Sequence, residues 1–134
     1  MSKIPESIVE AVVAEVSTRM KRPEYAQLAI GSFVETHPDA GRFITAHLDA
    51  LGGGEGVMHT VFHAQVIDEC FQRHRGRPCR AVGFRELDAA AKGDPQAKLT
   101  TQQPALASYV ASNVDSEPQR RLLALIAVAL DRST

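Results

Sequence analysis

The sequence predicts an all-α protein, a compact bundle of about six or seven short helices around a single core. Two observations lead to this class. Apolar residues recur at three- and four-residue spacing in most segments, which is the period of a helix and not of a half-buried strand. Seven Pro and nine Gly residues divide the 134-residue chain into segments of helical length. Apolar residues make up 44% and charged residues 23%, ordinary values for a soluble globular protein.

The first half of the chain contains four predicted helices. The first spans residues 5–21, with Pro5 in its first turn and a valine-rich apolar stripe. The second, residues 23–37, is apolar nearly all the way round and is therefore expected to be central. The third spans residues 38–51. A glycine-rich connection at 52–56 precedes the fourth and longest helix, residues 55–74; it lacks the Lys and Ser or Thr of a phosphate-binding loop.

The second half is predicted to hold three helices, at residues 84–91, 104–113 and 117–131. The polar stretch 92–103 contains Gly93-Asp94-Pro95 and is predicted to be a linker. We expect one domain over residues 1–134, with an N-terminal helical group to about residue 80 and a C-terminal group from 81 that share one core.

The fourth predicted helix carries the residues best suited to chemistry. His59, His63, Cys70 and His74 fall within a strip about 60° wide when projected down the axis of this helix. The polar side chains at 65, 68, 69, 72 and 73 lie on the opposite side, so the strip is expected to be partly or wholly buried.

Imidazole and thiolate are ligands that transition metals prefer, and a pair four residues apart on a helix can reach one ion. His59 with His63 is one such pair, and Cys70 with His74 is another, so a metal or haem site is one hypothesis. Each pair needs further ligands from elsewhere. The alternative is that these residues only border the core. In that case a buried imidazole without an acidic partner has a lowered pKa.

Five arginines between residues 73 and 85 form a local basic segment. Guanidinium groups bind phosphate and carboxylate, so Arg75, Arg77 and Arg80 are candidate anion-binding residues. Only Phe71 and Phe84 are aromatic residues near them, which disfavours a base-stacking surface and hence nucleic-acid binding. The net charge of −1 gives no long-range attraction to nucleic acid or to an anionic membrane.

The second and the last predicted helices are apolar on more than one face, so either they are central or one face binds a partner or a second copy. Tyr25 and Tyr109 are the aromatic residues expected at such a surface. The longest apolar run, Leu122 to Leu130, is too short to span a membrane. Two cysteines without a zinc or disulfide pattern fit a reducing, cytoplasmic location.

Three functional hypotheses remain open. The first is a non-enzymatic helical interaction or regulatory module, which forms a homo-oligomer through its apolar helix faces and needs no cofactor. The second is a protein that binds a small ligand, a transition metal or haem at His59, His63, Cys70 and His74. The third is anion or nucleic-acid contact through residues 73–85. No Gly-x-Ser-x-Gly elbow is present, so nucleophilic catalysis has little support.

Overall fold

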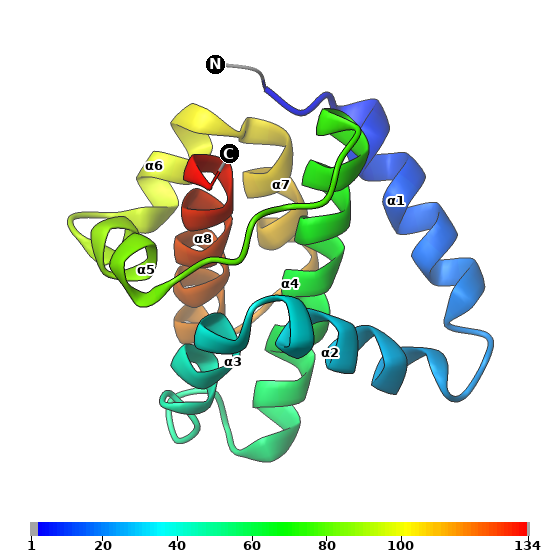
Figure 1. The fold of residues 1–134 in the computed structure, drawn as a ribbon, viewed down its shortest axis with the longest axis horizontal. Coiled ribbons are helices and arrows are strands. Elements are labelled where there is room, and N and C mark those ends of the chain that lie inside the picture. Colours follow the sequence, from blue (N-terminus) through cyan, green and yellow to red (C-terminus); the bar gives the residue numbers. More distant parts are fainter. Residues whose placement is uncertain (1–2, 134) are drawn as a thin grey trace.

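The computed structural model describes residues 3–133, and over that range the chain forms eight α-helices (Figure 1). The predicted all-α class is confirmed, with one helix more than expected. The helices are α1 (Glu6–Arg19), α2 (Tyr25–Thr36), α3 (Pro38–Thr45), α4 (Gly54–Arg75), α5 (Phe84–Ala91), α6 (Pro95–Gln102), α7 (Pro104–Asn113) and α8 (Glu117–Arg132). None of these helices is long and apolar enough to cross a membrane.

Helix α8 lies at the centre of the bundle. Every side chain from Leu122 to Asp131 is buried, because α4, α5, α6 and α7 pack around it (Figure 1). A helix that is apolar on all sides is stable only when it is surrounded in this way. Buried apolar residues from each of the eight helices belong to one continuous cluster.

Helix α2 is not central, contrary to the expectation from its sequence. Only Ala29 and Phe33 are buried in it, whereas Leu28 is 66% exposed and Val34 is 42% exposed. The helix lies on the outside of the bundle against α3 and α4 (Figure 1). Its apolar residues therefore exceed what the core covers.

The predicted linker 92–103 contains a helix, α6, which packs on both α7 and α8. The side chain of Asp94 caps α6 by accepting hydrogen bonds from the backbone N–H groups of Gln96 and Ala97 at 3.1 and 3.2 Å. Pro95 follows in the first turn, where its missing N–H costs nothing. Leu99 is 1% exposed and attaches this otherwise polar helix to the core.

Helix α3 ends at Thr45, earlier than predicted, and turns lead from there to α4. Gly52 and Gly53 have φ values of +89° and +93°, a left-handed backbone region that favours glycine. Gly56 is required for a different reason, because a Cβ atom there would overlap the carbonyl oxygen of Leu51. The glycine-rich connection thus brings α4 back along α3.

A buried polar network secures the C-terminal end of α8. The amide oxygen of Gln103 accepts a hydrogen bond from the backbone N–H of Ile4 at 2.8 Å, and its Nε2 donates to Asp131 at 3.1 Å. The Arg75 guanidinium donates to the carbonyl oxygens of Leu130 and Asp131 at 3.2 and 2.8 Å. A cation in this position complements the negative end of the helix dipole. The network thereby ties α4, α8 and the segment before α1 together.

Candidate functional site

The stretch 55–74 forms a single helix, as predicted, but its residues are not all oriented as expected. Cys70 is buried, and His63 and His74 are half-buried. His59 is different, since 63% of its side chain is exposed and its Nε2 atom lies 4.0 Å from the Glu55 carboxylate. The inward-facing strip therefore begins at His63.

Two polar residues on the opposite side of α4 are buried as well. Gln65 is 7% exposed and Asp68 is 2% exposed. Helices α1 and α2 pack against α4 and cover much of this polar side. Sequence periodicity could not show this, because it does not tell how many neighbours surround a helix.

The histidines and thiols of α4 make contacts that suit a packed interior. The Nδ1 atom of His63 is hydrogen-bonded to the Tyr109 hydroxyl at 2.9 Å, and burial lowers the pKa of His63. Burial also raises the pKa of Cys70 to about 12, so its thiol stays protonated and is a poor nucleophile. Tyr109, expected at a partner surface, is buried, while Tyr25 is half-buried.

Within residues 3–133, no group of three or more His, Cys, Asp or Glu side chains is placed to hold a metal ion. The pairs His59/His63 and Cys70/His74 therefore have no third ligand of these types in the described chain. Metal or haem binding at these pairs stays a prediction from the sequence.

Sequence reasoning missed a buried polar contact that joins α2 and α3 to α4. His37, between α2 and α3, is fully buried, and its Nε2 atom lies 3.5 Å from a carboxylate oxygen of Asp68. The backbone N–H of Val82 donates to His37 Nδ1 at 3.1 Å. The buried thiol of Cys79 lies 3.8 Å from the Asp68 carbonyl oxygen, and burial, followed by Asp68, raises its pKa. This cluster is closed to solvent, so it serves the packing of the helices.

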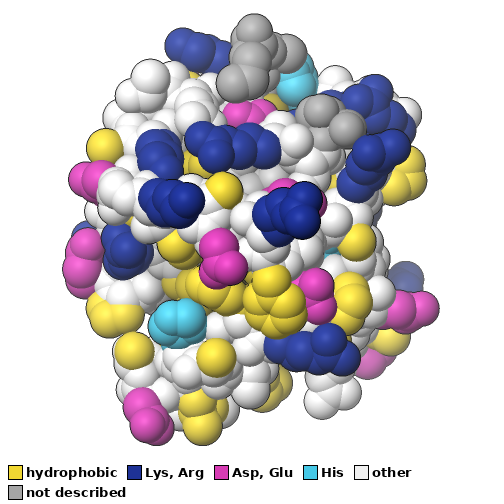
Figure 2. Space-filling view, turned by 60° about the vertical axis from the view of Figure 1, so that its left-hand side comes forward, with side chains coloured by type: hydrophobic (Ala, Val, Ile, Leu, Met, Phe, Trp, Pro, Cys, Tyr) yellow, Lys and Arg dark blue, Asp and Glu magenta, His cyan; other side chains and the backbone are white. Residues whose placement is uncertain are grey.

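The three candidate anion-binding arginines differ in their surroundings. Arg75 is occupied by the C-terminal end of α8, and its guanidinium also lies 4.7 Å from the centre of the Phe71 ring. Arg77 and Arg80 are exposed on the link between α4 and α5. Figure 2 shows one face of the molecule, on which Lys and Arg side chains are interspersed with carboxylates and do not form a continuous basic patch. Arg75 is therefore committed to α8 and is not available to an anion.

An apolar groove of about 590 Å³ lies between α2, α3 and the first half of α4. Apolar side chains from all three helices line it: Ile30, Val34, Pro38, Ala46, Val57, Met58 and Val61. Gly41 also lines it, and a Cβ atom on this glycine would lie in ordinary contact with the Val34 side chain, at 3.4 Å. Arg42 and Thr45 supply the polar groups of the lining.

Two large exposed apolar side chains lie at this groove. Among the described residues, six are strongly exposed, and two of them, Val34 and Met58, line the groove itself. Leu28 extends from another face of α2, and Leu48 lies in the turn after α3. Contiguous exposed apolar surface is typical of sites that bind another protein. The groove is therefore the best candidate for a functional surface.

The chain matches no protein-family model, no curated protein and no solved structure in the three comparisons.

Proposed function

We propose that the chain is a non-enzymatic interaction module that docks an apolar helix face in the groove between α2, α3 and α4. We further propose that the occupant is a second copy of the chain. The observation that supports this best is the mostly apolar lining of the groove, in which Val34 and Met58 remain exposed to solvent. Covering such side chains contributes about 25 cal/mol for each Å² of apolar surface removed from water.

The shape and lining of the groove suit a helix. On one side, the small side chain of Ala46 leaves room for another backbone to approach closely, whereas Gly41 is covered by Val34. Larger side chains on the other side, Ile30, Val57 and Val61, supply apolar contact area. An amphipathic helix binds a protein in this manner when its apolar face is laid into a hydrophobic groove.

A second copy fits this surface because the groove and the groups that could fill it lie on the same side of the molecule. In a two-fold symmetric dimer, one patch serves both partners, so a side chain such as Met58 can enter the groove of the other copy. The net charge of −1 causes little repulsion between two copies. Both features support self-association over an unrelated partner.

Sedimentation equilibrium over a wide range of protein concentration tests the proposal. We expect a reversible monomer–dimer equilibrium, and Met58→Glu should weaken it at least about tenfold, since a carboxylate would have to be buried at the interface. Met58 is 48% exposed, so the variant should fold normally.

The matched control is Phe84→Glu, because Phe84 is 43% exposed and lies at the start of α5, outside the groove. This variant should dimerise like the parent chain. A chain that stays monomeric at all concentrations contradicts the proposal. So does a dimer that Phe84→Glu disrupts and Met58→Glu does not.

A further inference from the structure

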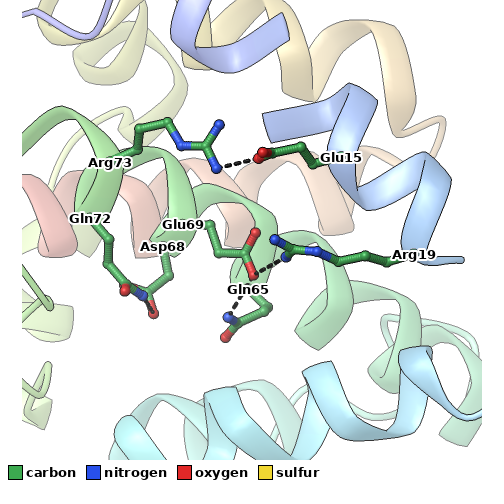
Figure 3. Close-up of polar contacts among 7 residues, drawn as sticks. All are labelled: Glu15, Arg19, Gln65, Asp68, Glu69, Gln72 and Arg73. Atoms are coloured by element: carbon green, nitrogen blue, oxygen red, sulfur yellow. Dashed lines mark hydrogen bonds and ion pairs between the residues drawn. The ribbon is translucent and has the colours of Figure 1, made fainter. Parts of the chain in front are cut away.

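A second hollow, of about 570 Å³, lies on a different side of α4 and is polar. Its walls come from α4, from Ser32 on α2, from Arg19 at the end of α1 and from residues 76–78 after α4. Figure 3 shows the side chains of α4 and α1 that face one another there. The hollow is separate from the apolar groove, since no residue lines both.

Gln65, which lines this polar hollow, carries a buried hydrogen-bond acceptor that has no partner. Its side chain is more than nine-tenths buried, at 7% exposure, and it lines the hollow. Its Nε2 atom donates a long hydrogen bond to Glu69 at 3.5 Å, while its Oε1 atom has no partner (Figure 3). A buried acceptor without a partner is costly, so its presence at the wall of a hollow points to a ligand that donates a hydrogen bond.

The charges around the hollow leave one cation available. The Arg19 guanidinium is paired with the Glu69 carboxylate at 3.4 Å, and Arg73 is paired with Glu15 (Figure 3). Arg77 also lines the hollow, and it is exposed and forms no ion pair with any residue in the range 3–133. The hollow therefore combines an excess positive charge at one end with hydrogen-bond acceptors, Gln65 and Glu69, at the other.

The lining also limits the class of ligand. None of the described residues that line the hollow is aromatic, so it offers no stacking platform for a nucleobase or another flat ring. The side chains of Ser32, Gln72 and Glu69 instead supply both donors and acceptors. Hydroxyl groups, which donate and accept, match such a lining.

We propose that this polar hollow binds a polyhydroxylated anion, the class that includes sugar phosphates and sugar acids. The anionic group binds Arg77, with Arg73 beside it. A ligand hydroxyl donates to Gln65 Oε1 and supplies the partner that this atom lacks. This site is independent of the apolar groove, so either proposal can fail without the other.

The test is an NMR titration of the full ¹⁵N-labelled chain with four probes: glucose 6-phosphate, gluconate, glucose and inorganic phosphate. We expect saturable shifts of amides around the hollow with glucose 6-phosphate or gluconate, and the stronger of the two shows whether the anionic group is a phosphate or a carboxylate. Glucose and inorganic phosphate should bind at least about tenfold more weakly, because glucose lacks the anionic group and inorganic phosphate lacks the sugar hydroxyls.

Two variants locate the binding. Arg77→Gln should weaken it at least about tenfold, whereas Arg80→Gln, an exposed arginine of the same link that does not line the hollow, should change it less than about twofold. Gln65→Met removes the acceptor while keeping the length of the side chain. It should weaken binding without lowering the thermal unfolding temperature, since the unpaired buried oxygen is gone.

Three results would overturn the proposal. The first is the absence of saturable shifts with both glucose 6-phosphate and gluconate at concentrations up to about 10 mM, which would detect millimolar affinity. The second is equally tight binding of inorganic phosphate, which would show a simple anion site. The third is an equal loss of binding in the Arg77→Gln and Arg80→Gln variants.

Discussion

Helices α2 and α8 have similar apolar patterns and opposite positions in the fold. Both carry apolar residues on more than one face, yet α8 is enclosed from Leu122 to Asp131 while α2 leaves Leu28 and Val34 exposed. The difference is the number of neighbours, since α8 packs against four helices and α2 chiefly against α3 and α4. An apolar helix is thus expected to be covered by other protein surface. The number of helices packed around it determines whether the chain's own core or a partner provides that surface.

The largest effect is expected where α2 ends. His37→Leu removes one of the two partners of the Asp68 carboxylate, the other being Gln72, and it removes the acceptor of the Val82 N–H group. Because both remain buried, the free energy of unfolding should fall by about 3 to 5 kcal/mol, as for a broken buried pair. Urea denaturation measures it, with Thr36→Ala as the exposed neighbouring control. A loss below about 1 kcal/mol would mean that Ala29 and Phe33 hold α2 in place without His37.

Matched leucines give the next largest contrast. Leu123 in α8 is fully buried, and Leu28 in α2 is 66% exposed. Leu123→Ala should lower the free energy of unfolding by about 2 to 5 kcal/mol, because it leaves a cavity in the core. Leu28→Ala should change it by less than about 0.5 kcal/mol. Equal effects at low protein concentration would contradict the outer position of α2.

A stabilising change is expected within α2. Gly31 is exposed in the middle of the helix, and a Cβ atom there would meet nothing within 4 Å. Gly31→Ala should therefore raise the free energy of unfolding by up to about 1 kcal/mol, the difference in helix propensity. Thermal unfolding of the two chains measures it. A loss of stability would show that another surface approaches Gly31 in solution, as a docked second copy would.

Acid should lower the stability of the part of the core where His63 on α4 contacts Tyr109 on α7. Burial lowers the pKa of His63 below its ordinary value of 6.5, so the unfolded chain takes up the proton more readily. Its contribution is fully present above pH 6.5 and is lost as the pH falls from there toward the folded pKa.

Urea denaturation over this pH range, compared between the parent chain and His63→Gln, measures the contribution. The variant should lose less stability on acidification than the parent chain. Tyr109→Phe should keep the parent's dependence, because burial and not the hydroxyl is the chief cause of the shift. An equally steep loss in His63→Gln would assign the acid sensitivity to other groups.

The sequence predicted the helices well and their surroundings less well. Helix α5 was predicted with both ends correct, because Gly83 and Lys92 flank a clear apolar period. Helix α6 was missed because its residues are mostly polar, although Asp94 followed by Pro95 is a recognisable helix start. Periodicity within one helix contains no information about its neighbours, and this explains the misplacement of α2.

The candidate sites were harder to predict for the same reason. The groove and the polar hollow each combine side chains from several helices, so no local motif marks them. Arg77 was singled out from the sequence as a candidate for anion binding, whereas Gln65 was noted only as one of the polar residues opposite the histidine strip. Its role depends on α1 and α2 packing against α4, which only the fold shows.

The central position of α8 has a consequence for synthesis on the ribosome. Of the eight helices, α8 is made last, and α4 to α7 cover their apolar faces by packing on it. Until residues 117–132 leave the exit tunnel, those apolar faces lack the helix against which they pack. They therefore stay accessible to chaperones and prone to aggregation. We therefore expect a nascent chain stalled before residue 117 to be digested readily by protease, and one extended past α8 to resist it.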